Sequence, residues 1–223
     1  LPDDASVTEI AQSLVIAGLS SSDSMTRLSC AEVMREHSDW PVTPAVELAV
    51  NSLVADLGHS NVVRSGSAGM TLERLVHLES VVTALRAALT EGQMEQRANA
   101  ALVLWRTQQP FEVKHLTESM RSGTETTRLA ICGLLGQMRS REGIPLLKLA
   151  LDSTIPTVRA AAVYALRSTA HVADLKPVAK HPKGFDLLAL RNTTPITESA
   201  QKTQLTAIAI LKMALHHTDA NIR

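Results

Sequence analysis

Apolar residues recur along the chain with the spacing of amphipathic helices, and the spacing itself repeats. Five segments begin with an arginine, followed mostly by small residues three and four positions later and usually by a large apolar residue at the seventh. Offsets of three, four and seven fall on one helical face, so each segment predicts a helix that buries a narrow stripe against close neighbours. The arginines are Arg27, Arg64, Arg97, Arg128 and Arg159, which lie 37, 33, 31 and 31 residues apart.

A second apolar signal precedes each arginine and predicts a first helix in each repeat. Two apolar residues four positions apart lie twelve and eight positions before the arginine, as Leu85 and Leu89 do before Arg97. In the second unit this pair is shifted by one residue, to Leu53 and Leu57. Each repeat is therefore expected to hold two helices joined by a short polar turn. Because one unit cannot bury its own apolar faces, the stack of units must supply the core.

Two helix starts are also visible. Thr43 followed by Pro44 predicts a cap with proline at the first helical position, where the missing N–H costs nothing. Ser6 and Glu9 have the spacing of a capping box, in which each side chain accepts a hydrogen bond from the other residue's N–H.

The repeat pattern extends over the whole chain, which we expect to be one domain of about six repeats and a truncated last one. The segment from Leu211 to Leu215 reproduces Leu147 to Leu151, and the sequence stops where a further second helix is due. It also starts with Leu1 instead of methionine, so we expect a piece of a longer protein. The sequence leaves open whether 171–203 is a damaged repeat or an inserted recognition loop. The approximate units are 6–39, 43–77, 78–108, 111–139, 141–170, an irregular 171–193, and 195–223.

This pattern resembles HEAT repeats, in particular the short variety of phycobilisome-lyase-type HEAT-like proteins. Their consensus places an aspartate in the turn and then Val-Arg-x-x-Ala-x-x-x-Leu, and the best match runs from Asp152 through Val158-Arg159 to Leu166. The resemblance covers the chain from about Ser6 to Arg223, with a departure between 171 and 203. It implies an all-α fold, a right-handed α-solenoid (superhelix) of two-helix repeats. Such folds mostly serve as binding surfaces.

Charge and apolar content restrict the class of partner. The chain has 22 basic and 22 acidic side chains, a net charge of zero, and no long run of either sign. A solenoid that binds nucleic acid normally presents a basic stripe, because phosphate neutralisation supplies most of the affinity. The apolar stretches fall short of the roughly 20 residues that a membrane span requires.

Cys30 and Cys132 fall on the buried stripes, which fits a reducing compartment. We therefore expect a cytoplasmic protein.

The sequence shows no constellation for catalysis. No histidine has metal-ligand spacing with a cysteine or a second histidine, and no nucleophile elbow or phosphate loop is present. The His-Glu pairs with which iron-binding HEAT-like hydroxylases hold their metal are also absent. We therefore predict no enzymatic activity, no catalytic residue, no metal and no cofactor.

The five arginines themselves are expected to be structural. In HEAT-like arrays this arginine typically pairs with a turn aspartate, so the resemblance implies a ladder of ion pairs in which Asp23, Asp152 and Asp219 are the candidate partners. The alternative is a row of anion-binding sites, one per repeat.

The exposed side of the second helices is the predicted binding surface, because it usually lines the concave face of such solenoids. Positions five, six and nine after each arginine flank the buried stripe, and their mixed polarity suits a protein or peptide ligand. We expect a non-enzymatic interaction scaffold. The alternatives are a regulatory repeat region of a larger enzyme, a bilin lyase or chaperone as the resemblance implies, and a HEAT-like DNA glycosylase, which the neutral charge disfavours. The candidate groove residues are Glu32, Glu36, Met70, Glu73, Arg106, Gln137 and Tyr164.

Overall fold

A computed structural model describes the backbone of residues 4–171 and the side chains of residues 9–169. Within this range the regular structure is entirely helical, with ten α-helices, two short 3-10 helices and no strand, which confirms the all-α prediction. The expected units 171–193 and 195–223 lie outside the described residues, apart from His171 at the end of α10. The helices are α1 Asp4–Leu19, α2 Ser24–Glu36, α3 Pro44–Asp56, α4 Val62–Leu75, α5 Glu79–Glu91, α6 Met94–Arg106, η1 Val113–Leu116, α7 Thr117–Ser122, α8 Glu125–Met138, η2 Arg141–Gly143, α9 Ile144–Leu151 and α10 Pro156–His171. None of the helices within 4–171 is long and apolar enough to cross a membrane.

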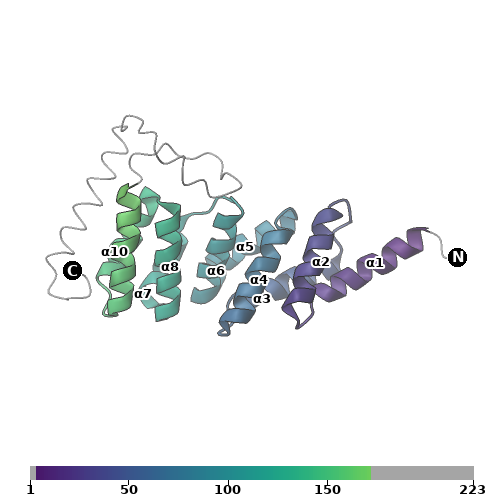
Figure 1. The fold of residues 1–223 in the computed structure, drawn as a ribbon, viewed down its shortest axis with the longest axis horizontal. Coiled ribbons are helices and arrows are strands. Elements are labelled where there is room, and N and C mark those ends of the chain that lie inside the picture. The colour runs from purple at the N-terminus through teal and green to yellow at the C-terminus, as the bar shows by residue number, and fades with distance from the viewer. Residues whose placement is uncertain (1–3, 172–223) are drawn as a thin grey trace, which may run out of the picture. The chain divides into compact units, whose positions relative to one another are not determined.

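The chain divides into two units, residues 1–127 and 128–223, with the division in the first turn of α8. In the first unit the helices form two rows. The first helices α1, α3 and α5 contact one another in sequence, and so do the second helices α2, α4 and α6. Figure 1 shows α2, α4 and α6 side by side, with α3 and α5 behind them. Each first helix also packs on its own second helix, so the apolar core lies between the two rows.

Each of the five arginines lies in the first turn of a second helix. Arg27, Arg97, Arg128 and Arg159 are the fourth residues of α2, α6, α8 and α10, and Arg64 is the third residue of α4. The apolar residues that follow them are buried, including Ala31 and Met34 in α2. Thr71 stands where other repeats have a large apolar residue. It is fully buried and donates its hydroxyl hydrogen to Ser67 O at 2.9 Å, so the polar group is satisfied within its own helix.

The two expected helix starts have different outcomes. Thr43 caps α3 as predicted, because its side chain accepts a hydrogen bond from Val46 N and Pro44 occupies the first turn. The expected start at Ser6 is wrong, since the helical backbone of α1 already begins at Asp4.

In the second unit, α9 packs against both η2 and α10. Leu147 of α9 and Leu166 of α10 are fully buried. Helices α8 and α10 approach closely at Gly136, where an added Cβ would lie 3.1 Å from Ala165 Cβ. Small residues at this contact thus allow the close packing that the sequence pattern predicts.

Leu104 provides a test of the buried stripe. Its side chain is fully buried in α6, so Leu104→Ala should lower the free energy of unfolding by about 2–5 kcal/mol, from lost apolar burial and the cavity left behind. Leu48, 73% exposed on α3, is the matched control, and its replacement by Ala should change stability by less than about 0.5 kcal/mol. Equilibrium denaturation measures both. Equal effects of the two substitutions would contradict the assigned helix faces.

Candidate partner-binding face

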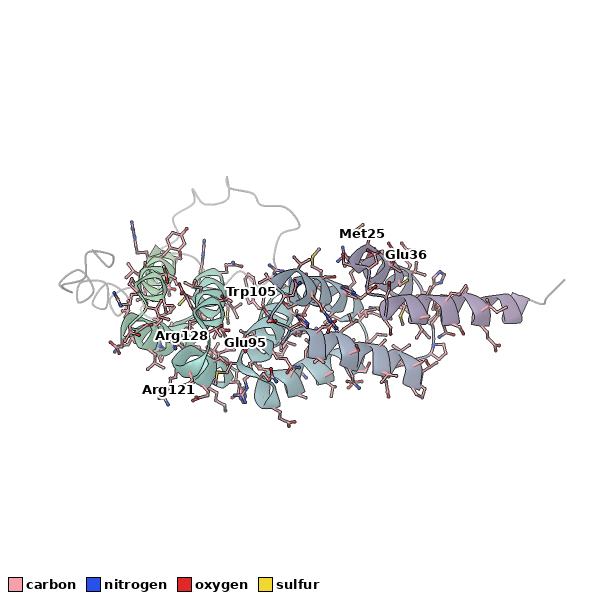
Figure 2. The ribbon with its side chains drawn as sticks, turned by 90° about the horizontal axis from the view of Figure 1, so that it is seen from below. Met25, Glu36, Glu95, Trp105, Arg121 and Arg128 are labelled. Atoms are coloured by element: carbon pink, nitrogen blue, oxygen red, sulfur yellow. The ribbon has the colours of Figure 1, made fainter. Side chains whose placement is uncertain are left out.

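The second helices of the first unit present a continuous exposed side, here called the outer face. It consists of residues that share a helical face by their spacing, and Figure 2 shows two of them, Met25 and Glu36, on the outer side of α2. Three of the expected groove residues on these helices, Glu36, Met70 and Arg106, are exposed, and Glu32 and Glu73 are partly exposed. The outer face comprises Met25, Glu32 and Glu36 of α2, Val63, Gly66, Met70, Glu73 and Arg74 of α4, and Arg106 of α6.

Ion pairs across the outer face join successive second helices. Glu32 of α2 lies 3.4 Å from Arg74 Nε of α4, and Glu73 of α4 lies 3.0 Å from Arg106 Nη1 of α6. Glu32 also pairs with Arg35 of its own helix. Glu32 and Glu73 by themselves would make this surface acidic. In the structure, arginines from the next helix bind both Glu32 and Glu73, so much of that negative charge is neutralised locally.

These ion pairs contribute little to the stability of the fold. All four side chains remain substantially in contact with solvent, and pairs in that setting are typically worth about 0–1 kcal/mol. Breaking either pair would therefore cost the fold little stability.

The other part of the outer face is apolar and uncovered. Met25 is 67% exposed, Val63 is 77% exposed, and Met70 is 44% exposed. Val63 and Met70 are seven residues apart and so lie on one side of α4, with Gly66 between them. A Cβ added at Gly66 would meet nothing within 4 Å. Packing therefore does not require this glycine, which costs the helix about 1 kcal/mol relative to alanine.

The remaining two groove candidates lie in the second unit. Gln137 of α8 is exposed, and Tyr164 of α10 is exposed over most of its surface. Tyr164 combines an aromatic ring with a hydroxyl group, a combination common in protein interfaces.

The repeated arginines hydrogen-bond mainly to the turns that precede them. Arg27 is buried and donates from Nη1 to Ser21 O and Ser22 O, at 2.6 and 3.1 Å. Arg97 Nε donates to Gly92 O at 2.7 Å, and Arg159 Nη1 donates to Ser153 O at 2.8 Å. Backbone carbonyls just after α1, α5 and α9 thus receive the cations of Arg27, Arg97 and Arg159.

The arginines were expected to form ion pairs with turn aspartates. One of those aspartates makes other hydrogen bonds, and one arginine pairs with a different aspartate. Asp23 caps α2, where its carboxylate accepts from Thr26 N and Thr26 Oγ1, and these hydrogen bonds lower the pKa of Asp23. A carboxylate does bind the exposed Arg64, but it is Asp56 at the end of α3, at 2.7 Å. Arg128 Nη1 donates to Ser153 Oγ at 3.4 Å. Asp219 lies outside the described residues.

Neither cysteine offers a reactive thiolate at neutral pH. Cys132 is buried, which raises the pKa of its thiol to about 12, and partial burial also raises the pKa of the Cys30 thiol. Among the described side chains, no group of three His, Cys, Asp or Glu residues is placed to hold a metal ion.

No protein-family model and no curated protein matches the sequence. One solved structure, the crystal structure of an engineered protein from the Northeast Structural Genomics Consortium, is 20% identical and superposes with a TM-score of 0.41. The comparison covers 95% of this chain and 92% of that chain. At this level the similarity carries no argument about family or function.

A double-mutant cycle on Glu73 and Arg106 measures the ion pair between α4 and α6. The coupling energy between Glu73→Gln and Arg106→Gln should be about 0.2–1 kcal/mol, because both groups remain in contact with solvent. It should fall further at about 1 M salt, where the screening length is only a few ångströms. A coupling above about 2 kcal/mol would show that this pair holds the helices together.

Proposed function

We propose that the chain is a right-handed α-solenoid of HEAT-like repeats. Two features of the described residues support this proposal. First and second helices form separate rows in the first unit, and an arginine recurs in the first turn of every second helix in both units. An array of this kind gains its core from neighbouring repeats and leaves one side of each second helix uncovered.

We infer that the protein is a non-enzymatic scaffold that binds a protein or peptide across the outer face. The observation that carries this inference is the composition of that face, where exposed Met25, Val63 and Met70 adjoin ion pairs that link neighbouring helices. Exposed apolar side chains beside a charged border are typical of protein interfaces. A cytoplasmic location is proposed with it, because both cysteines within the described residues are free thiols.

The local shape of α4 suits a closely docked ligand. Gly66 is exposed between Val63 and Met70, so a ligand can approach the helix backbone there. Methionine side chains adapt to irregular surfaces because they are unbranched and polarizable. A peptide with apolar anchors and flanking charges of both signs fits this surface better than a nucleic acid, since the arginines are already paired with carboxylates.

Comparative affinity capture from a lysate of the native source tests the proposal. Met70→Asp should lose the captured partner, because it places a charge in the apolar part of the outer face. Leu48→Asp is the matched control, since it makes the same kind of change at an exposed apolar residue of a first helix. Quantitative mass spectrometry should show a partner that Leu48→Asp retains and Met70→Asp loses at least about tenfold, equivalent to 1.4 kcal/mol.

Gly66→Ala separates binding from stability in the same experiment. The added methyl group meets open space, so this variant should unfold at equal or higher denaturant concentration than the wild type. It should nevertheless bind the captured partner more weakly, because the methyl group keeps the ligand from the backbone. If both Met70→Asp and Gly66→Ala retain every captured partner, docking on the outer face is ruled out.

A further inference from the structure

Acidic and basic side chains are divided unequally between the two units. Residues 1–127 hold sixteen Asp and Glu side chains and nine Lys and Arg side chains, which gives the first unit a net charge of minus seven. Residues 128–223 hold the remaining six acidic and thirteen basic side chains, so the second unit carries plus seven. The net charge of zero therefore results from two large and opposite charges on different units.

Exposed carboxylates in the first unit recur at the starts of the first helices. Glu47 lies in the first turn of α3, Glu79 begins α5, and Glu118 is the second residue of α7. Helix α3 packs beside α5, and α5 contacts η1, which leads directly into α7. Because successive first helices of a repeat array run in the same direction, their starts lie along one edge of the row. We call Glu47, Glu79 and Glu118 the acidic row.

The carboxylates of the acidic row are not neutralised within the fold. All three residues are exposed, and none of their carboxylates forms an ion pair or a hydrogen bond with another described side chain. Glu32 and Glu73, by contrast, each have an arginine of the next second helix beside them. The helix dipole favours a carboxylate at a helix start, but it leaves the outward side of that carboxylate available to a cation from another molecule.

The second unit presents exposed cations that also lack a partner. Arg139 follows the end of α8, Lys148 lies in α9, and Arg167 lies in α10. All three are exposed, and none forms an ion pair with a described side chain. Within the described part of this unit, Glu142 and Asp152 are the acidic residues, against six Lys and Arg residues. We call Arg139, Lys148 and Arg167 the basic group.

Two members of the basic group emerge at the same end of neighbouring helices. A Cβ added at Gly136 of α8 would lie 3.1 Å from Ala165 Cβ of α10, so the two second helices are in close contact there. Arg139 follows Gly136 by three residues, and Arg167 follows Ala165 by two. Because second helices of a repeat array also run in one direction, both arginines lie just beyond this contact.

A second copy of this chain is the partner whose charge complements both surfaces. Two copies carry no net charge, so no overall repulsion keeps them apart. A contact between the second unit of one copy and the first unit of another brings opposite charges together, whereas contacts between like units bring like charges together. Such a head-to-tail contact is heterologous, so it leaves an acidic row and a basic group uncovered to which further copies can add.

We propose that copies of this chain associate head to tail, with the basic group of one copy docked on the acidic row of the next. The contact goes beyond the proposed docking of a peptide on the outer face, because it uses different residues and needs no other protein. A failed test here leaves the capture experiment on Met70 unaffected.

Sedimentation equilibrium of the full chain over a range of protein and NaCl concentrations tests the proposal. At about 25 mM salt the weight-average mass should rise with protein concentration and exceed that of a dimer, because each added copy leaves a new surface uncovered. The association constant should fall at least about tenfold at about 0.5 M salt, because salt screens contacts between exposed charges. Monomers at every concentration would overturn the proposal, and so would association that strengthens with salt.

Charge reversal locates the contact. One triple variant reverses the acidic row, and the other reverses the basic group. Each variant alone should associate at least about tenfold more weakly than the wild type, because its two surfaces now carry the same sign. An equimolar mixture of the two should associate again, since every surface then meets the opposite charge, and a mixture that stays monomeric would contradict the contact. The variants are Glu47→Lys/Glu79→Lys/Glu118→Lys and Arg139→Glu/Lys148→Glu/Arg167→Glu.

The matched control is Arg86→Glu/Glu91→Lys, which exchanges two exposed charges of α5 at unchanged net charge and should associate like the wild type. Gln at the same two sets of positions keeps the test decisive if a reversed charge at a helix start prevents folding. Each Gln variant should also associate at least about tenfold more weakly than the control, and equal association would overturn the proposal. A wild-type chain that stays monomeric but binds a short DNA duplex would overturn it in favour of nucleic acid.

Discussion

The buried guanidinium at the start of α2 and of α10 is the constraint on which the turn into each of these two helices depends. Arg27 and Arg159 are both almost completely buried, and a buried cation must find hydrogen-bond acceptors. The turn carbonyls that receive them follow the end of the preceding first helix, where the helix dipole is negative. The same charge at the start of its own helix is unfavourable, so this contact offsets the cost and fixes the turn between the two helices.

In the first unit, the surfaces that hold the fold together are distinct from the surface proposed to bind a partner. The turns and the apolar stripes are occupied in holding the two helix rows together. The outer face has no such part in the fold, since its apolar side chains are exposed and Gly66 faces open space. Binding is therefore proposed there.

The periodic features of this fold could be predicted from sequence, and the features that depend on neighbouring repeats could not. The stripe after each arginine follows from helical spacing, and even Thr71 is buried as its position requires. The acceptors of Arg27 were missed because backbone carbonyls leave no mark in a sequence. The pairing of Glu73 with Arg106 depends on which helices become neighbours.

The most direct test of this division between structure and binding is Arg159→Ala, followed by equilibrium unfolding and by affinity measurement with a partner captured on the outer face. Loss of a buried, charged hydrogen-bonding group should lower the free energy of unfolding by about 1.5–3 kcal/mol. Under conditions where the variant remains folded, its affinity for the partner should be unchanged. Unaltered unfolding together with a lost partner would contradict the account, because the arginines would then be the binding row and not the structural element.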